Sequence, residues 1–115
     1  MEFNYERNPT AVTIYGKSVE IPTKTAYFVQ ETRRIAAEIV KAPDAVKAAE
    51  ATLEGIRLYL GDEFVSEHFG SDAGVADAGS LDTDEIGALW VFLNRASAKA
   101  TEEVLKKYAP AEASH

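Results

Sequence analysis

The chain has 115 residues, of which 46% are hydrophobic and 27% charged, as in an ordinary globular protein of one domain. The net charge is −7 and the basic residues are scattered, which argues against nucleic acid as a partner because a polyanion needs lysines and arginines at several phosphates. The absence of cysteine excludes disulfides, thiolate metal sites and cysteine nucleophiles. No apolar run approaches the ~18 residues that cross a bilayer, and the polar start is no signal peptide, so we expect a cytoplasmic protein without membrane contact.

Apolar side chains alternate on both sides of a glycine in residues 11–21, which predicts a β-hairpin. A two-residue loop of Gly16 and Lys17 suits a type II′ turn, because glycine accepts the positive φ of the first position. Residues 2–6 are a candidate third strand. A lone hairpin is marginal in water, so we expect it to pack on an apolar surface. Four residues of the hairpin then share one face: Val12, Ile14, Val19 and Ile21.

Four helices are predicted after the hairpin, since apolar residues recur there at spacings of three and four. Thr23 or Thr25 is expected to cap the first helix, and Pro43 suits the first turn of the second. Asp82 is expected to cap the last helix, and Glu85 lies three residues on in a capping-box pattern. The predicted helices cover residues 24–41, 43–60, 62–69 and 83–108.

The sequence therefore predicts an α+β fold in a single domain of residues 1–110. Its hairpin packs on a bundle of three main helices and one short helix. Trp90 and Tyr108 belong to the apolar stripe of the last helix. The small residues of 70–80 predict a mobile loop, and 111–115 a flexible tail.

The segment GDEFVSEHFG, residues 61–70, has the composition of a chemical site, with three acidic residues and one histidine. A zinc-protease helix needs a second histidine four residues away, and neither a phosphate-binding glycine motif nor a serine-hydrolase motif occurs in the chain. We therefore expect no catalytic residue, no metal site and no cofactor, with His68 and the glutamates on a solvated side. We expect Gly61 to end the second helix and Asp62 to cap the short helix that follows. Phe69 should anchor this short helix, and Gly70 should end it.

Several bulky apolar residues fall outside the predicted core stripes of the second and last helices. One interpretation is that they cover the hairpin or a neighbouring helix. The alternative is a protein-binding or self-association face, which is the usual meaning of a contiguous exposed apolar patch. The candidate partner-binding residues are Leu58, Tyr59, Val91, Phe92 and Leu105.

The order of turns and aromatic residues resembles a family of small proteins encoded in the tail modules of phages and prophages. The hairpin IYGKSVEI with Gly16, the helix-ending Gly61, the pair Phe69-Gly70 and the pair Lys107-Tyr108 stand at the places matching that family's pattern. The resemblance covers roughly residues 12–110. The chain departs from the pattern at Phe64 and Val65, where small or polar residues are expected.

This resemblance implies a non-catalytic tail assembly chaperone, which binds the helical tape-measure protein or another tail protein until the tail tube forms. Such proteins often form homo-oligomers. An alternative is a structural head–tail or tail completion component of the virion. A second alternative is a small acidic metal-binding or hydrolytic domain built on Glu63, Glu67 and His68.

Overall fold

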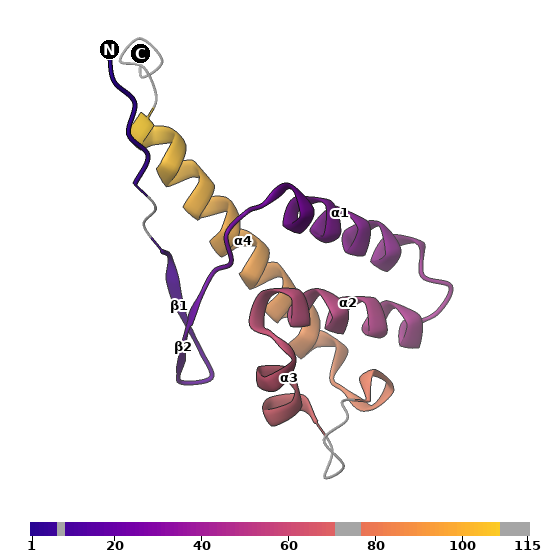
Figure 1. Ribbon diagram of the computed structural model, residues 1–115. Helices are drawn as coiled ribbons and strands as arrows, with labels where there is room; N and C mark the ends of the chain where they lie inside the picture. Colours follow the sequence, from indigo (N-terminus) through magenta and orange to yellow (C-terminus); the bar gives the residue numbers. More distant parts are fainter. Residues whose placement is uncertain (7–8, 71–76, 109–115) are drawn as a thin grey trace.

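The computed structural model describes residues 1–6, 9–70 and 77–108, and it confirms the α+β fold (Figure 1). A two-stranded antiparallel hairpin is followed by three main helices and one short helix, with a single turn of 3-10 helix before the last. The predicted tail of residues 111–115 and most of the predicted loop, residues 71–76, lie outside the described residues. The elements are β1 (Ala11–Ile14), β2 (Lys17–Glu20), α1 (Ala26–Lys41), α2 (Ala45–Leu60), α3 (Asp62–Phe69), η1 (Ala78–Ser80) and α4 (Thr83–Tyr108).

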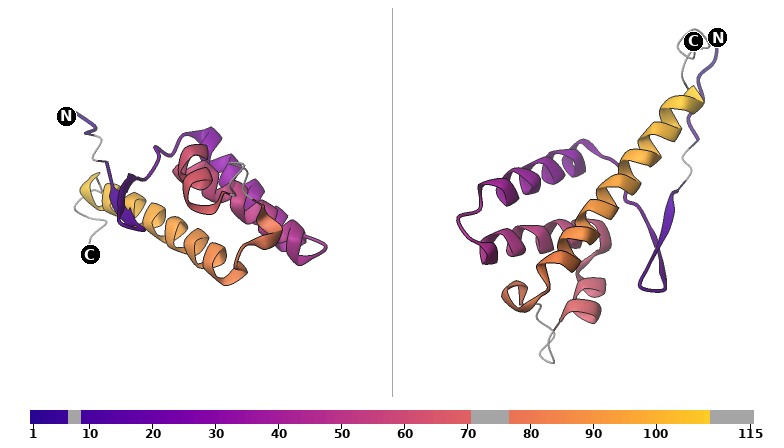
Figure 2. Two further views of the ribbon diagram at one scale, coloured as in Figure 1. Left: turned by 90° about the horizontal axis from the view of Figure 1, so that it is seen from below. Right: turned by 180° about the vertical axis from the view of Figure 1, so that it is seen from behind.

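Helix α2 lies at the centre of the bundle. It packs against α1, α3, α4 and η1, and the antiparallel pair of α1 and α2 crosses the first half of the long α4 (Figures 1 and 2). Because α2 has neighbours on several sides, seven of its sixteen residues are buried. Arg34 of α1 adds ion pairs to Glu54 of α2 and to Glu31 and Glu38 of its own helix. The largest fully buried side chains of the core are Ile35, Ile56, Val65, Ile86 and Leu93.

The hairpin has a different register from the predicted one. Tyr15 and Gly16 form the loop, with φ of 51° and 79°, so both central residues have the positive φ of a type I′ turn. Val12 therefore pairs with Val19, and Ile14 with Lys17. The predicted Gly16-Lys17 loop was wrong because a tyrosine at positive φ is uncommon. Since the shift keeps the alternation, the apolar face still packs on the core.

Two caps agree with prediction and two do not. The side chain of Thr25 caps α1, and Asp82 Oδ1 accepts hydrogen bonds from the amides of Asp84 and Glu85 at the start of α4. Pro43 lies before α2 rather than in its first turn, because Asp44 is the cap and accepts from the Lys47 amide. Asp62 is the first residue of α3 and makes no capping bond, since the cap position is Gly61 with a φ of 88°.

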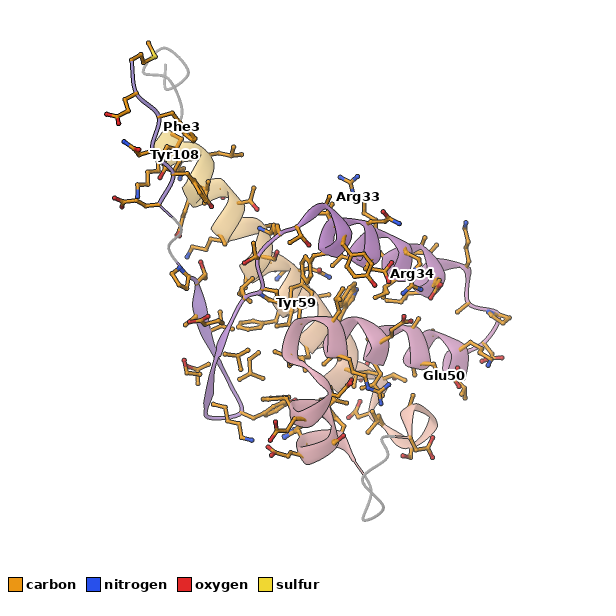
Figure 3. The ribbon with its side chains drawn as sticks, viewed as in Figure 1. Phe3, Arg33, Arg34, Glu50, Tyr59 and Tyr108 are labelled. Carbon is orange, nitrogen blue, oxygen red and sulfur yellow. The ribbon has the colours of Figure 1, made fainter. Side chains whose placement is uncertain are left out.

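The N-terminal segment does not form a third strand. Phe3 and Tyr5 instead contact the ring of Tyr108 at the end of α4, each with ring centroids 5.6 Å apart (Figure 3). The backbone amide of Glu6 donates to the Tyr108 hydroxyl at 2.8 Å. The start of the chain is therefore held by aromatic contacts beside the far end of α4 and not by strand pairing (Figures 1 and 2).

The molecule is elongated. Its principal extents are 56 × 31 × 23 Å and its radius of gyration is 16.7 Å. A compact chain of this length would have a radius of gyration of about 13 Å. The difference reflects α4, which extends well beyond the bundle (Figure 2). Among the described residues, no helix combines the length and apolarity needed to cross a membrane.

Candidate functional site

The candidate functional site lies at the C-terminal half of α4, because this half extends beyond the other helices of the bundle (Figure 2). Helix α4 has 26 residues, whereas α1 and α2 have 16 each. At about 1.5 Å per residue, the difference of ten residues corresponds to ~15 Å of helix. Ser97 is the last fully buried residue of α4. We call residues 98–108 the overhang.

Apolar side chains remain exposed on the overhang. Val104 and Leu105 are 37% and 65% exposed, and Leu105 is the more exposed of the two because it points away from the stripe formed by Leu93 and Val104. The last turn of the overhang is partly covered by the aromatic contacts of Tyr108. The preceding turns have no comparable cover among the described residues, so the apolar stripe of α4 continues past its core.

A groove of about 290 Å³ runs along this part of the overhang. One wall is α4 from Ala100 to Leu105, and the other is formed by the link between β2 and α1, residues 21–24, with Tyr5 and Thr10 at its end. Ligand pockets typically measure ~300–1,000 Å³. This groove is thus large enough for one or two side chains but small for a cofactor.

Lys24 places a positive charge in the groove. Its ammonium group donates hydrogen bonds to the backbone carbonyl of Ser97 and to the hydroxyl of Thr101, both on α4. Burial lowers the pKa of Lys24 below its ordinary value of 10.5. Lys24 is the single charged residue among the described residues that line the groove.

The structure corrects the prediction that Tyr59 faces a partner. Tyr59 is only 5% exposed, and its ring packs edge-to-face against those of Phe28 and Trp90, with centroids at 5.2 and 6.0 Å. Its hydroxyl donates to Asn94 Oδ1 at 2.8 Å, and burial raises the pKa of the phenol. Tyr59 is therefore a core residue that joins α1, α2 and α4, which excludes it from a docking surface.

The other four predicted partner-binding residues do not form one patch. Leu58 is half-buried and packs against the core. Val91 and Phe92 are about half exposed, but Leu105 lies 13 residues after Phe92, roughly 20 Å further along α4. Only Leu105 lines the groove. The structure thus assigns one of the five residues to the groove and separates it from Val91 and Phe92.

Glu63, Glu67 and His68 are exposed, which confirms the predicted solvated side of segment 61–70, but Glu67 and His68 also contact the hairpin. The ring of His68 stacks on that of Tyr15 at the hairpin turn, with centroids 3.8 Å apart and planes 17° apart. Glu67 forms an ion pair of 2.6 Å with Lys17, which also lies over the ring of Phe64. Helix α3 therefore receives the tip of the hairpin.

Tyr15 extends this contact to α4. Its hydroxyl donates to Glu85 Oε2 at 2.6 Å, and Glu85 also lies 3.9 Å from His68 Nε2. Burial, followed by the hydrogen bond and the negative charge of Glu85, raises the pKa of Tyr15 to about 12. Glu85 thus accepts from the hairpin rather than closing a capping box. We call Tyr15, His68 and Glu85 the clasp, because their contacts join the hairpin to α3 and α4.

Within the described ranges, no three histidine or acidic side chains come together in a way that would hold a metal ion. Among the described residues, Glu63 forms no hydrogen bond or ion pair with Tyr15, His68 or Glu85. The cavity beside Tyr15 and His68 measures only about 50 Å³. This volume is far below the ~300–1,000 Å³ of typical ligand pockets.

Sequence reasoning missed the groove for a specific reason. Helical periodicity placed Trp90 and Tyr108 in one apolar stripe of the last helix, but it treated the whole stripe as core. The predicted lengths of the helices already contained the signal, because the last helix was much longer than those beside it. The contact of Lys24 with α4 could not be predicted from local patterns in the sequence, because Lys24 and Ser97 are 73 positions apart.

Comparisons with protein families, with curated proteins and with solved structures found no match for this chain.

Proposed function

We propose that this chain is a non-catalytic assembly protein that binds an amphipathic helix of a partner protein along the overhang of α4. The observation that carries the proposal is the continuation of the α4 apolar stripe past Ser97 into a groove with Leu105 at its edge. Proteins recognise amphipathic helices by laying their apolar face into such a groove.

The resemblance to small proteins of phage tail modules supports a more specific role. Its members resemble tail assembly chaperones, whose client is the long and helical tape-measure protein. A client of this kind exposes amphipathic helices before the tail tube forms around it. The net charge of −7 supports the same role, because an acidic chaperone keeps an aggregation-prone complex in solution.

Co-expression tests the chaperone role. The client that the resemblance implies, a long and helix-rich tape-measure protein, is expressed alone and together with this chain, and the soluble fraction and the co-purified amount of the client are measured. We expect the soluble fraction of the client to rise in the presence of the chain and the two proteins to purify together. An unchanged soluble fraction and no co-purification would contradict the proposal.

The variant Leu105→Glu tests the location of the binding surface. Because Leu105 is 65% exposed, the variant should keep its melting temperature, while the amount of co-purified client should fall roughly tenfold or more, as for a central apolar contact.

Phe92→Glu is the matched control, since Phe92 is 46% exposed on the same helix but lies outside the groove. It should bind the client as the unmodified chain does. An equal loss for both variants would show that the groove is not the site.

A further inference from the structure

We propose that the groove beside the overhang accepts a bulky apolar side chain of the partner together with an adjacent aspartate or glutamate, whose carboxylate pairs with Lys24. The inference rests on the proposed function and adds a sequence preference to it. It is argued from the charge, the hydrogen bonds and the walls of the groove.

The hydrogen bonds of Lys24 leave its charge without a counter-ion. An ammonium group has three N–H donors, and the two described acceptors, Ser97 O and Thr101 Oγ1, are neutral. Lys24 makes no ion pair with any carboxylate of the described residues, although this chain has more acidic than basic residues. Four other described lysines form such pairs, namely Lys17, Lys47, Lys106 and Lys107, whereas Lys41 and Lys99 resemble Lys24 in forming none with a described carboxylate.

Two hydrogen bonds to α4 hold the ammonium group of Lys24 at the groove, although the residue as a whole is exposed. Both acceptors lie on α4, so the side chain is drawn from the β2–α1 link across to the helix. The lowered pKa of Lys24 agrees with partial removal of its ammonium group from water. A carboxylate arriving with a partner would compensate that loss of solvation by a charge-assisted hydrogen bond.

The walls beside Lys24 are suited to an apolar side chain. The apolar residues Ile21, Pro22, Val104 and Leu105 are among those that line the groove, and besides Lys24 the polar groups of its lining are threonine hydroxyls and a tyrosine. The volume of about 290 Å³ limits the occupant to one or two side chains. The partner segment should thus carry leucine, isoleucine, methionine or phenylalanine next to its acid.

A carboxylate fits better than a phosphate. Protein sites for phosphate usually combine arginines, backbone amides or several cations, whereas one lysine acts as a single point charge. Lys24 stands alone among the described lining residues, and no arginine joins it there. The groove therefore fits an acidic side chain of a protein segment.

Peptide selection tests the preference in the absence of the client. Random 12-residue peptides displayed on a carrier are selected on the immobilised full chain and on two variants. Lys24→Met removes the charge in the groove, and Lys99→Met is the matched control because it removes one charge from α4 outside the groove. The unmodified chain and Lys99→Met should enrich peptides with an acid next to a bulky apolar residue, and Lys24→Met should lose the acidic preference.

A binding cycle then measures the pairing directly. The best selected peptide, labelled with fluorescein, is compared with its Glu→Gln or Asp→Asn form on the unmodified chain and on Lys24→Met. Removing either charge should weaken binding by about fivefold, as for a partly exposed ion pair, and removing both should cost no more than removing one. Equal effects of the peptide change on both proteins would overturn the inference.

Each failure has a distinct meaning. Selected peptides that are apolar but not acidic would overturn the carboxylate pairing and leave the proposed function standing. Sedimentation of the chain alone could also show dimers that form with rising concentration and are lost in Lys24→Met. This result would overturn the inference, because the groove would then bind a second copy of the chain. The proposed function itself is tested separately by co-expression. It would fail if neither the unmodified chain nor its Leu105→Glu variant changed the soluble fraction of the client.

Discussion

Gly55 of α2 lies directly against the ring of Trp90 on α4. A Cβ atom at Gly55 would lie 2.3 Å from Cζ3 and 2.7 Å from Cε3 of Trp90. The Trp90 ring also packs edge-to-face on Tyr59, whose hydroxyl is bonded to Asn94. Glycine is thus required at this position for packing rather than for an unusual φ, and the indole ring fills the space that a methyl group would need.

Gly55→Ala should therefore destabilise the protein by about 1–2 kcal/mol, because overpacking costs ~1–3 kcal/mol and the gain in helix propensity offsets up to ~1 kcal/mol of it. Gly87→Ala is the control, since Gly87 lies in α4 with open space where its Cβ would be. It should stabilise the protein by up to ~1 kcal/mol. Thermal unfolding of both variants measures the two effects, and a rise in melting temperature for Gly55→Ala would contradict the packing.

At the scale of elements, the hairpin is attached to the helices through its tip. Tyr15 stacks on His68 of α3 and donates to Glu85 of α4, while Lys17 pairs with Glu67. The apolar face of the hairpin packs on the core below these contacts. A two-stranded sheet is not stable by itself, so these contacts are what hold it in place.

The pKa of Tyr15 gives this attachment a pH dependence. The folded pKa of about 12 is above the ordinary value of 10.0, so the contribution of Tyr15 to stability is complete below about pH 10 and is lost as the pH rises through about 12. The difference in tyrosinate absorbance between the unmodified chain and Tyr15→Phe should titrate with a midpoint near pH 12.

Glu85→Gln separates the causes of that shift. The midpoint should fall in this variant because the carboxylate charge is gone, but it should stay above 10 because burial is the largest cause of the raised pKa. A titration midpoint of Tyr15 near pH 10 in the unmodified chain would contradict the described contacts of Tyr15 with His68 and Glu85.

Periodicity in the sequence was sufficient to predict the elements but not their contacts. The four helices and the hairpin follow from spacings of apolar residues, caps and one glycine. The tertiary contacts of Tyr59 and His68 do not follow from these patterns. A helical wheel of α2 cannot show that α1 and α4 pack on two faces of α2, and a wheel of α3 cannot show that the hairpin tip reaches α3. Tyr15 at positive φ escaped prediction because local preference favoured Gly16 as the first loop residue.

At the scale of the whole molecule, the elongated shape follows from α4, which is longer than α1 and α2 and extends beyond them. Helix α4 packs on α2 over its first half and contacts the N-terminal segment at its last turn, which leaves the groove between them. The extent of 56 Å along the long axis, against 31 and 23 Å across it, is the consequence. A partner helix lying along the overhang would extend the bundle and complete the cover of the α4 stripe.

Hydrogen exchange of the chain, alone and in complex with its client, tests this account most directly. The backbone amides of the overhang and of residues 23–24 should exchange more slowly in the complex, because the partner helix covers both walls of the groove. Amides of α2 and α3 should keep their rates, since these helices lie away from the groove. Slower exchange confined to α2 and α3, with none in the overhang, would contradict the proposal that the uncovered half of α4 binds the partner.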